Sequence, residues 1–308
     1  MTARRQVHLM GTIIEVQINH EREEQLATAV VEKLKLYEHR FSANDDSAEL
    51  MQVNLQAGKA PVKVAPELFD LIRLGKEYSL LPLGNLNIAI GPLVKLWKIG
   101  FAGAQRPTDA QIKERLALTD PHQIVLDAAS QTVYLTRPGM EIDLGALAKG
   151  YIADLLVTFL RRQGVTSALL NLGGNVVVIG GKPTNADGNW HVGLQDPAQP
   201  LGNYLRVLNV RDGSVVTSGI YQRNLKVKGH FYHHIFDKHT GYPTPAKITS
   251  LTIRSTRSVA GEIWTTMLFG QPLEEIQRVV AKLPGVAAIV IDQEDHLTEI
   301  SGPGWQEI

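Results

Sequence analysis

The hydrophobic positions of the chain follow two periods, one typical of strands and the other typical of helices. Residues 7–18 are rich in β-branched side chains that partly alternate with polar ones, which predicts a strand. After Glu21 the apolar side chains recur every three or four positions, as on one face of a helix. That face comprises Leu26, Val30, Leu34, Tyr37 and Phe41. A strand followed by an amphipathic helix is therefore predicted for the first forty residues.

Strand and helix patterns continue to alternate irregularly along the chain. Pro66 suits a first helical position and predicts a helix that fades near Leu80. A third helix is predicted from just after Asp143 to Arg162, with Gly164 as its stop. Two more helices are predicted at 258–269 and 272–283, and strands at 123–127, 132–137, 167–172, 175–180, 190–196, 204–210, 214–219, 248–255 and 286–292. Successive strands with helices between groups indicate an α+β fold, with mixed or antiparallel sheets and flanking helices, in one domain spanning 1–308.

Composition narrows the class of protein. The 308 residues include 31 basic and 31 acidic side chains, and this balance argues against a surface that coats nucleic acid. No stretch approaches eighteen uninterrupted apolar residues, so no membrane span is predicted, and the first residues lack the apolar core of a secretory signal. The absence of cysteine excludes disulfides, thiolate metal sites and a cysteine nucleophile. The classes of protein that remain are an enzyme and a protein that binds a small molecule.

The first candidate site is the segment IDLGALAKGYIAD, residues 142–154. Asp143 immediately precedes small residues and the predicted helix start, where freed backbone N–H groups attract anions such as phosphate. Lys149, six residues later, is within reach of such a group. The alternative is that Asp143 only caps the helix and Lys149 is solvated. The chain has neither a GxGxxG nor a GxxxxGK[ST] sequence, which excludes a Rossmann fingerprint and a P-loop.

The second candidate is a histidine-rich segment, residues 229–243, which contains His230, His233, His234 and His239. Adjacent histidines such as His233 and His234 point to opposite faces of a strand, which disfavours a shared zinc site. A histidine that transfers protons and a structural histidine both remain open.

The third candidate is the helix predicted at 258–269. Glu262 and Thr266 are four residues apart and share one face, with Thr265 adjacent to it. A carboxylate with a hydroxyl is a set of hard oxygen ligands suited to Mg²⁺. The alternative is an ordinary helix surface.

These segments, in their order and spacing, resemble the ApbE family of FAD:protein FMN transferases. The resemblance runs from about residue 8 to 295 and includes MGT at 10–12, FSANDDSAELMQVN at 41–54 and NIAIGPLVKLWKIG at 87–100. It continues through IDLGALAKGYIAD, NLGGN at 171–175, TSGIYQRN at 217–224, HHIFDKHTGYP at 233–243 and the helix with Glu262. The resemblance implies an ApbE-like fold whose active site lies in a cleft between two intimate subdomains.

The resemblance also implies a reaction and a set of residues. Enzymes of this family transfer the FMN half of FAD to a Thr or Ser hydroxyl of a protein with a D-G-x-[ST]-G-A-[ST] type motif, and they release AMP with the help of Mg²⁺. Residues that match FAD contacts are Met10, Asn85, Leu86, Asn87, Asp143, Lys149 and Phe236. The metal ligands match the Ala146 carbonyl, Glu262 and Thr266, with Thr265 as an additional candidate. His234 matches the histidine that activates the acceptor hydroxyl.

The sequence departs from the family pattern at three places. Glu262 and Asn87 stand where the family usually has Asp, and Lys238 and His239 change the usual DPxTG to DKHTG, beside the expected site. Two further functions therefore stay open, an FAD pyrophosphatase that gives FMN and AMP, and a flavin-binding protein without catalysis. Many relatives carry a lipidated N-terminal cysteine that this sequence lacks, which makes the cytoplasm the expected location, with an exported domain whose signal has been removed as the alternative.

Overall fold

The computed structural model describes residues 1–200, 202–220, 224–227, 229–245 and 247–306. The helices are α1 (Glu23–Phe41), α2 (Glu49–Leu55), α3 (Pro66–Ser79), α4 (Gly91–Trp97), α5 (Asp109–Leu116), α6 (Ala148–Arg162), α7 (Ser258–Leu268) and α8 (Leu273–Val280), with 3₁₀ turns η1 (Ile88–Ile90) and η2 (Pro121–Gln123). The strands are β1 (Thr2–Leu9), β2 (Thr12–Asn19), β3 (Val62–Lys63), β4 (Ile124–Asp127), β5 (Thr132–Leu135), β6 (Ser167–Leu172), β7 (Asn175–Ile179), β8 (Trp190–Gln195), β9 (Tyr204–Val210), β10 (Gly213–Gly219), β11 (Asn224–Val227), β12 (His230–His233), β13 (Ile248–Ser255), β14 (Val286–Asp292) and β15 (Leu297–Ser301). The predicted α+β class is confirmed.

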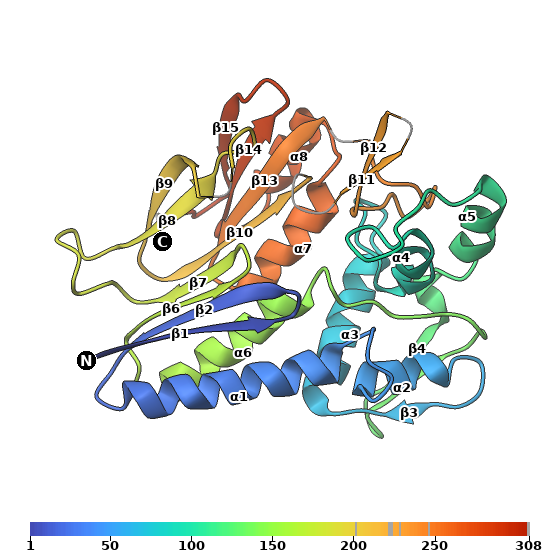
Figure 1. Ribbon diagram of the computed structural model, residues 1–308, viewed down its shortest axis with the longest axis horizontal. Coiled ribbons are helices and arrows are strands. Elements are labelled where there is room, and N and C mark those ends of the chain that lie inside the picture. The colour runs from blue at the N-terminus through green and yellow to red at the C-terminus, as the bar shows by residue number, and fades with distance from the viewer. Residues whose placement is uncertain (201, 221–223, 228, 246, 307–308) are drawn as a thin grey trace.

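Eight strands form one antiparallel sheet, in the order β1-β2-β6-β7-β10-β13-β14-β15. Helices α1, α6 and α7 cover one face of this sheet, and the β8–β9 hairpin covers the other (Figure 1). In β14, Ala288 and Val290 face the helices, while Ile289 and Ile291 face the hairpin. Because both of its faces are buried, β14 is apolar along nearly its whole length rather than alternating.

Helix α7 is the most enclosed helix beside the cleft described below. Its residues are buried on nearly every side, because α7 packs against both the sheet and α6. Two glycines permit this close approach. A Cβ atom at Gly261 would lie 2.4 Å from Val216 of β10, and one at Gly150 of α6 would lie 2.7 Å from the backbone oxygen of Ser258. The two glycines therefore let α7 lie closer to its neighbours than other residues would allow.

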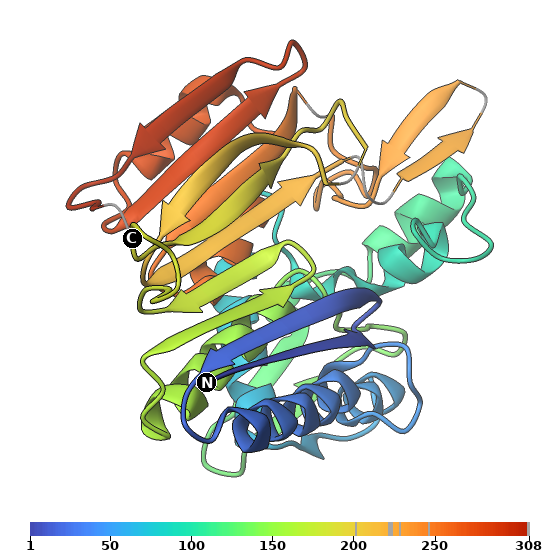
Figure 2. The same cartoon turned by 60° about the vertical axis from the view of Figure 1, so that its left-hand side comes forward.

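Helices α3, α4 and α5 and the small sheet β3-β5-β4 lie beside one end of the large sheet (Figure 1). Trp97 is fully buried at the centre of a separate apolar cluster, which also contains Leu93, Ile112 and Phe236. The β11–β12 hairpin lies next to α4 and α5 in both views (Figure 2). This region therefore brings a segment near residue 236 against one near residue 97.

Two predicted boundaries are wrong. The strand predicted at 7–18 is two strands, because Met10 and Gly11 form a tight turn with φ of 53° and 67°. The helix predicted to begin just after Asp143 begins at Ala148, since residues 144–147 form a turn first. Helices α2, α4 and α5 and strands β3, β11, β12 and β15 lie outside the predicted elements. For α5 the sequence does contain a signal, because Thr108 and Gln111 form a capping box.

Among the described residues, no helix combines the length and apolar character needed to cross a membrane.

Candidate active site

A cleft of about 640 Å³ opens between the covered sheet and the region of α3 and α4. Two of its sides carry most of the candidate site residues. The helix wall consists of residues 143–149 and of α7, and the loop wall consists of residues 85–90 and 234–236. The β1–β2 turn, α1 and residues 42–44 after it, Gly173, the end of β10 and apolar side chains between residues 94 and 101 also line the cleft. Segments distant in sequence thus meet around one cavity.

Eleven of the twelve site residues that the resemblance implies line this cleft. They are Met10, Asn85, Leu86, Asn87, Asp143, Ala146, Lys149, His234, Phe236, Glu262 and Thr266. The exception is Thr265, which is fully buried and donates its hydroxyl to the Glu262 carbonyl over 3.2 Å. Thr265 therefore lies on the side of α7 that faces away from the cleft, and only Thr266 presents its side chain there.

Glu262 is a buried carboxylate in the helix wall, 6% exposed. Asn175 donates its amide to Glu262 Oε1 over 2.8 Å, and the Gly150 N–H also donates to this carboxylate. Burial raises the pKa of Glu262 above its usual value, while the Lys149 ammonium and these hydrogen bonds oppose the rise. A buried carboxylate beside a cavity is well suited to a cation that replaces its lost hydration.

Asp143 organises the turn that precedes α6. Its carboxylate accepts from the Gly145 N–H over 2.8 Å, and its own N–H donates to the Ile88 carbonyl over 2.9 Å. The N-cap of α6 is Leu147, which makes no side-chain cap bond, so the simple capping alternative for Asp143 is wrong. Asp143 instead shapes the loop that carries Ala146 into the cleft and connects that loop to the opposite wall.

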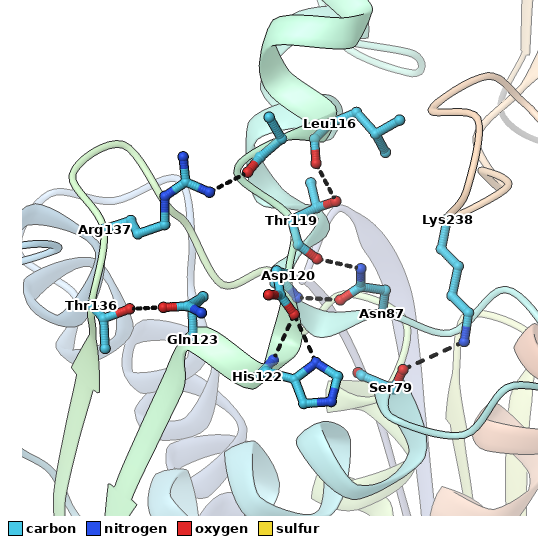
Figure 3. Close-up of polar contacts among 12 residues, drawn as sticks. Ser79, Asn87, Leu116, Thr119, Asp120, His122, Gln123, Thr136, Arg137 and Lys238 are labelled. Carbon is cyan, nitrogen blue, oxygen red and sulfur yellow. Dashed lines mark hydrogen bonds and ion pairs between the residues drawn. The ribbon is translucent and has the colours of Figure 1, made fainter.

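The two asparagines of the loop wall bind backbone atoms. Asn87 donates to the Thr119 carbonyl over 2.8 Å and accepts from the Ala89 N–H over 2.9 Å (Figure 3). Asn85 donates to the carbonyl of Phe269, just beyond α7. An ionised Asp at position 87 has no donor for the Thr119 carbonyl, which gives the Asn87 departure from the family pattern a structural reason.

The two adjacent histidines differ in environment, as the sequence indicated. His233 is 3% exposed, its Nδ1 accepts from the Ile235 N–H, and its Nε2 therefore donates to the Thr244 carbonyl over 2.7 Å. Burial lowers the pKa of His233 below its ordinary 6.5. His234 lines the cleft instead. His233 is therefore a structural histidine, while a proton-transferring role for His234 stays a prediction.

Lys238 lies outside the cleft and holds the loop wall from behind. Its Nζ donates to the carbonyls of Leu81 over 2.6 Å and Ser79 over 3.4 Å, at the end of α3 (Figure 3). Burial lowers its pKa, with Asp237 opposing. Lys238 and His239 border a second hollow of about 560 Å³ that shares Asn87 with the cleft.

Sequence reasoning did not single out Glu38 or Phe101, which line the cleft, and it gave no role to Thr217 and Ser218 of the TSGIYQRN motif, which also line it. Glu38 accepts a hydrogen bond from the Met10 N–H and holds the β1–β2 turn there. In α1, Glu38 is next to the buried residues Tyr37 and Phe41 of the apolar face. This position was the signal in the sequence that could have identified Glu38 as a cleft residue. Residues 221–223 of the TSGIYQRN motif lie outside the described residues.

No group of three His, Asp or Glu side chains suited to a metal occurs among the described residues. A cation at this cleft would instead use one carboxylate, from Glu262, with the hydroxyl of Thr266 and the carbonyl of Ala146. These are hard oxygen donors, and Mg²⁺ usually takes only one or two protein carboxylates and completes its shell with water and phosphate. The donor set therefore fits Mg²⁺.

The ApbE family model matches residues 10–290. The chain belongs to the ApbE family. A protein of Klebsiella pneumoniae named FAD:protein FMN transferase is 43% identical over 267 residues, which cover 87% of this chain and 82% of that protein. A protein of Treponema pallidum with the same name is 35% identical and covers 96% and 85%, respectively.

Solved ApbE structures share this fold. The ApbE protein of Thermotoga maritima superposes with a TM-score of 0.87 at 23% identity, covering 97% of each chain. The flavin transferase ApbE of Vibrio cholerae gives 0.82, also at 23% identity, covering 99% of this chain and 98% of that one. The α+β ApbE-like fold expected from the resemblance is thereby confirmed.

Proposed function

We propose that this ApbE family member, as a single domain over 1–308, transfers the FMN half of FAD to a Thr or Ser hydroxyl of an acceptor protein and releases AMP, with Mg²⁺ as cofactor. The family membership and the names of its relatives support the flavin transferase class. The observation that carries the proposal is one cleft that collects oxygen donors, a lysine and a histidine from separate segments.

The helix wall would hold the pyrophosphate of FAD. Lys149 lies in the first turn of α6 and contributes a positive charge beside the Glu262 carboxylate. When bound by Ala146, Glu262 and Thr266, Mg²⁺ supplies Lewis acidity and neutralises the negative charge of the pyrophosphate. Phosphoryl transfer depends on such neutralisation and on in-line positioning more than on covalent help.

The loop wall would hold the acceptor hydroxyl. The hydroxyl oxygen attacks the phosphorus of the FMN half, the bond from that phosphorus to the AMP phosphate breaks, and the hydroxyl proton passes to His234. The product is a phosphoester-linked flavin, and AMP leaves. Met10, Asn85, Leu86, Asn87, Asp143 and Phe236 would shape the pocket for FAD. Exclusion of water matters, because attack by water yields FMN and AMP instead.

The test is incubation of the protein with FAD, Mg²⁺ and an acceptor that carries a D-G-x-[ST]-G-A-[ST] motif, followed by in-gel flavin fluorescence. A fluorescent acceptor band that disappears with EDTA, and that requires the acceptor hydroxyl, is expected. Release of AMP without acceptor modification would instead establish the FAD pyrophosphatase, and bound FAD that stays intact with Mg²⁺ present would establish a binding protein. The cytoplasmic location stays a prediction.

A further inference from the structure

A chain of buried hydrogen bonds lies behind Glu262 and leads away from the cleft. Asn175, at the start of β7, is 1% exposed and donates through Nδ2 to Glu262 Oε1 over 2.8 Å. Ser258, at the start of α7, is fully buried and donates its hydroxyl to Asn175 Oδ1 over 2.6 Å. In the sequence, NLGGN was only one of the motifs of the family resemblance, and Asn175 was assigned no role.

The direction of each bond in this chain is fixed. The Glu262 carboxylate can only accept, so the NH₂ group of Asn175 must point to it. The carbonyl oxygen of Asn175 then faces Ser258, whose hydroxyl donates to it. Ser258 is itself held in place, because its N–H donates to Asp154 Oδ1 over 2.7 Å and that of Val259 donates to Oδ2 over 3.2 Å. Asp154 thus holds the start of α7.

The space around Glu262 is equally restricted. A Cβ at Gly150 would lie 2.6 Å from Glu262 Cγ, so the longer side chain, which stands where the family usually has Asp, fits against a glycine. With one oxygen bound by Asn175 and the stem against Gly150, the carboxylate has little freedom to rotate. Groups that orient metal ligands in this way typically change metal affinity about 10–100-fold when they are removed.

We infer that Asn175, held by Ser258, is a positioning residue that orients the Glu262 carboxylate toward the cation in the cleft. This inference rests on the proposed metal site and adds to it a residue that contacts neither FAD nor the cation. Its role differs from general structural support, because it predicts a loss of Mg²⁺ affinity in a protein that remains folded and still binds FAD in EDTA.

The experiment compares Asn175→Ala and Ser258→Ala with the matched control Asn171→Ala. Asn171 belongs to the same NLGGN segment, but its side chain accepts from the Gly174 N–H rather than contacting Glu262. Mg²⁺ is titrated calorimetrically into each protein saturated with FAD, and FAD is titrated separately in EDTA. Circular dichroism and thermal unfolding verify the fold.

The dissociation constant for Mg²⁺ should rise about 10–100-fold in Asn175→Ala and less in Ser258→Ala, and stay unchanged in Asn171→Ala. The double variant should weaken binding by less than the product of the two single effects, because both act through one amide. A folded Asn175→Ala that binds Mg²⁺ as tightly as the natural chain would overturn the inference alone. A natural chain that binds no Mg²⁺ would overturn the proposed metal site with it. Should Asn175→Ala fail to fold, Ser258→Ala decides by the same criterion.

Discussion

The two walls of the cleft are held in different ways. The helix wall is fixed by close packing, with glycines where helices meet and a buried polar chain behind Glu262. The loop wall is fixed by hydrogen bonds from side chains to backbone, such as those of Asn87, His233 and Lys238. The proposed cation sits at the tightly packed wall, where ligand geometry matters most, and the proposed acceptor site lies at the wall built from loops.

His234→Ala gives the largest expected effect and tests the chemistry assigned to the loop wall. The rate of FMN transfer should fall about 10²–10⁴-fold, as is typical when a general base is lost. FAD affinity, Mg²⁺ affinity and the free energy of unfolding should stay unchanged, because the cation and FAD are held mainly elsewhere. Single-turnover flavinylation gives the rate, and calorimetry gives the affinities. A parallel loss of Mg²⁺ affinity would contradict the assignment of the cation to the helix wall and of the general base to the loop wall.

Gly150→Ala tests the packing of the helix wall. Without a clash, alanine at this position in the first turn of α6 would stabilise the helix by up to about 1 kcal/mol. Here the added Cβ meets the Ser258 carbonyl at 2.7 Å, and this backbone atom cannot move cheaply. The free energy of unfolding should therefore fall by about 1–3 kcal/mol, as measured by urea denaturation, and Mg²⁺ affinity should fall with it.

Gly75→Ala in α3 is the matched change beside the loop wall. Its Cβ would meet the side chain of Ile88 at 2.5 Å rather than backbone, and a side chain can shift. The free energy of unfolding should fall by less than in Gly150→Ala, and Mg²⁺ affinity should stay unchanged. Equal losses at the two glycines would contradict the distinction between the walls.

Lys238→Met tests the support behind the loop wall. The lysine donates to the Ser79 and Leu81 carbonyls, and cations are favourable at the end of a helix such as α3. Removing these bonds should lower the free energy of unfolding by about 1 kcal/mol. Lys113→Met, at an exposed position on α5, serves as the control and should change the free energy of unfolding little. An unchanged stability of Lys238→Met would mean that these contacts contribute nothing net.

Much of this site follows from the sequence, because ordered motifs specify which segments must meet. Glu262 and Thr266 share a face by helical period alone, and the family pattern brings His234 and Lys149 to the same cleft. Thr265 was misplaced because one residue along a helix rotates the side chain by about 100°, out of the cleft. The sequence pattern contains no signal for such a rotation unless the buried face is known.

The errors in the fold come from backbone geometry that side-chain patterns conceal. The β-branched run at 7–18 continues across the turn at Met10, a non-glycine residue with positive φ. Asp143 looks like a helix cap, yet its carboxylate binds the turn before α6. The role of the Asn175 amide depends on its contacts with Ser258 and Glu262, which lie more than eighty residues away in the sequence.

The pH dependence of stability isolates one histidine beside the loop wall. The folded protein holds His233 neutral, since burial lowers its pKa below 6.5, whereas the unfolded chain takes up a proton near that value. The unfolded state therefore binds more protons, and the free energy of unfolding should fall as the pH drops below about 6.5, at a rate of up to about 1.4 kcal/mol per pH unit. Urea denaturation between pH 8 and 5 measures this slope. His233→Gln keeps one donor and one acceptor but does not titrate, so its slope should be shallower in this range. An identical slope in both proteins would show that His233 keeps its ordinary pKa and that burial does not keep its ring neutral in the folded protein.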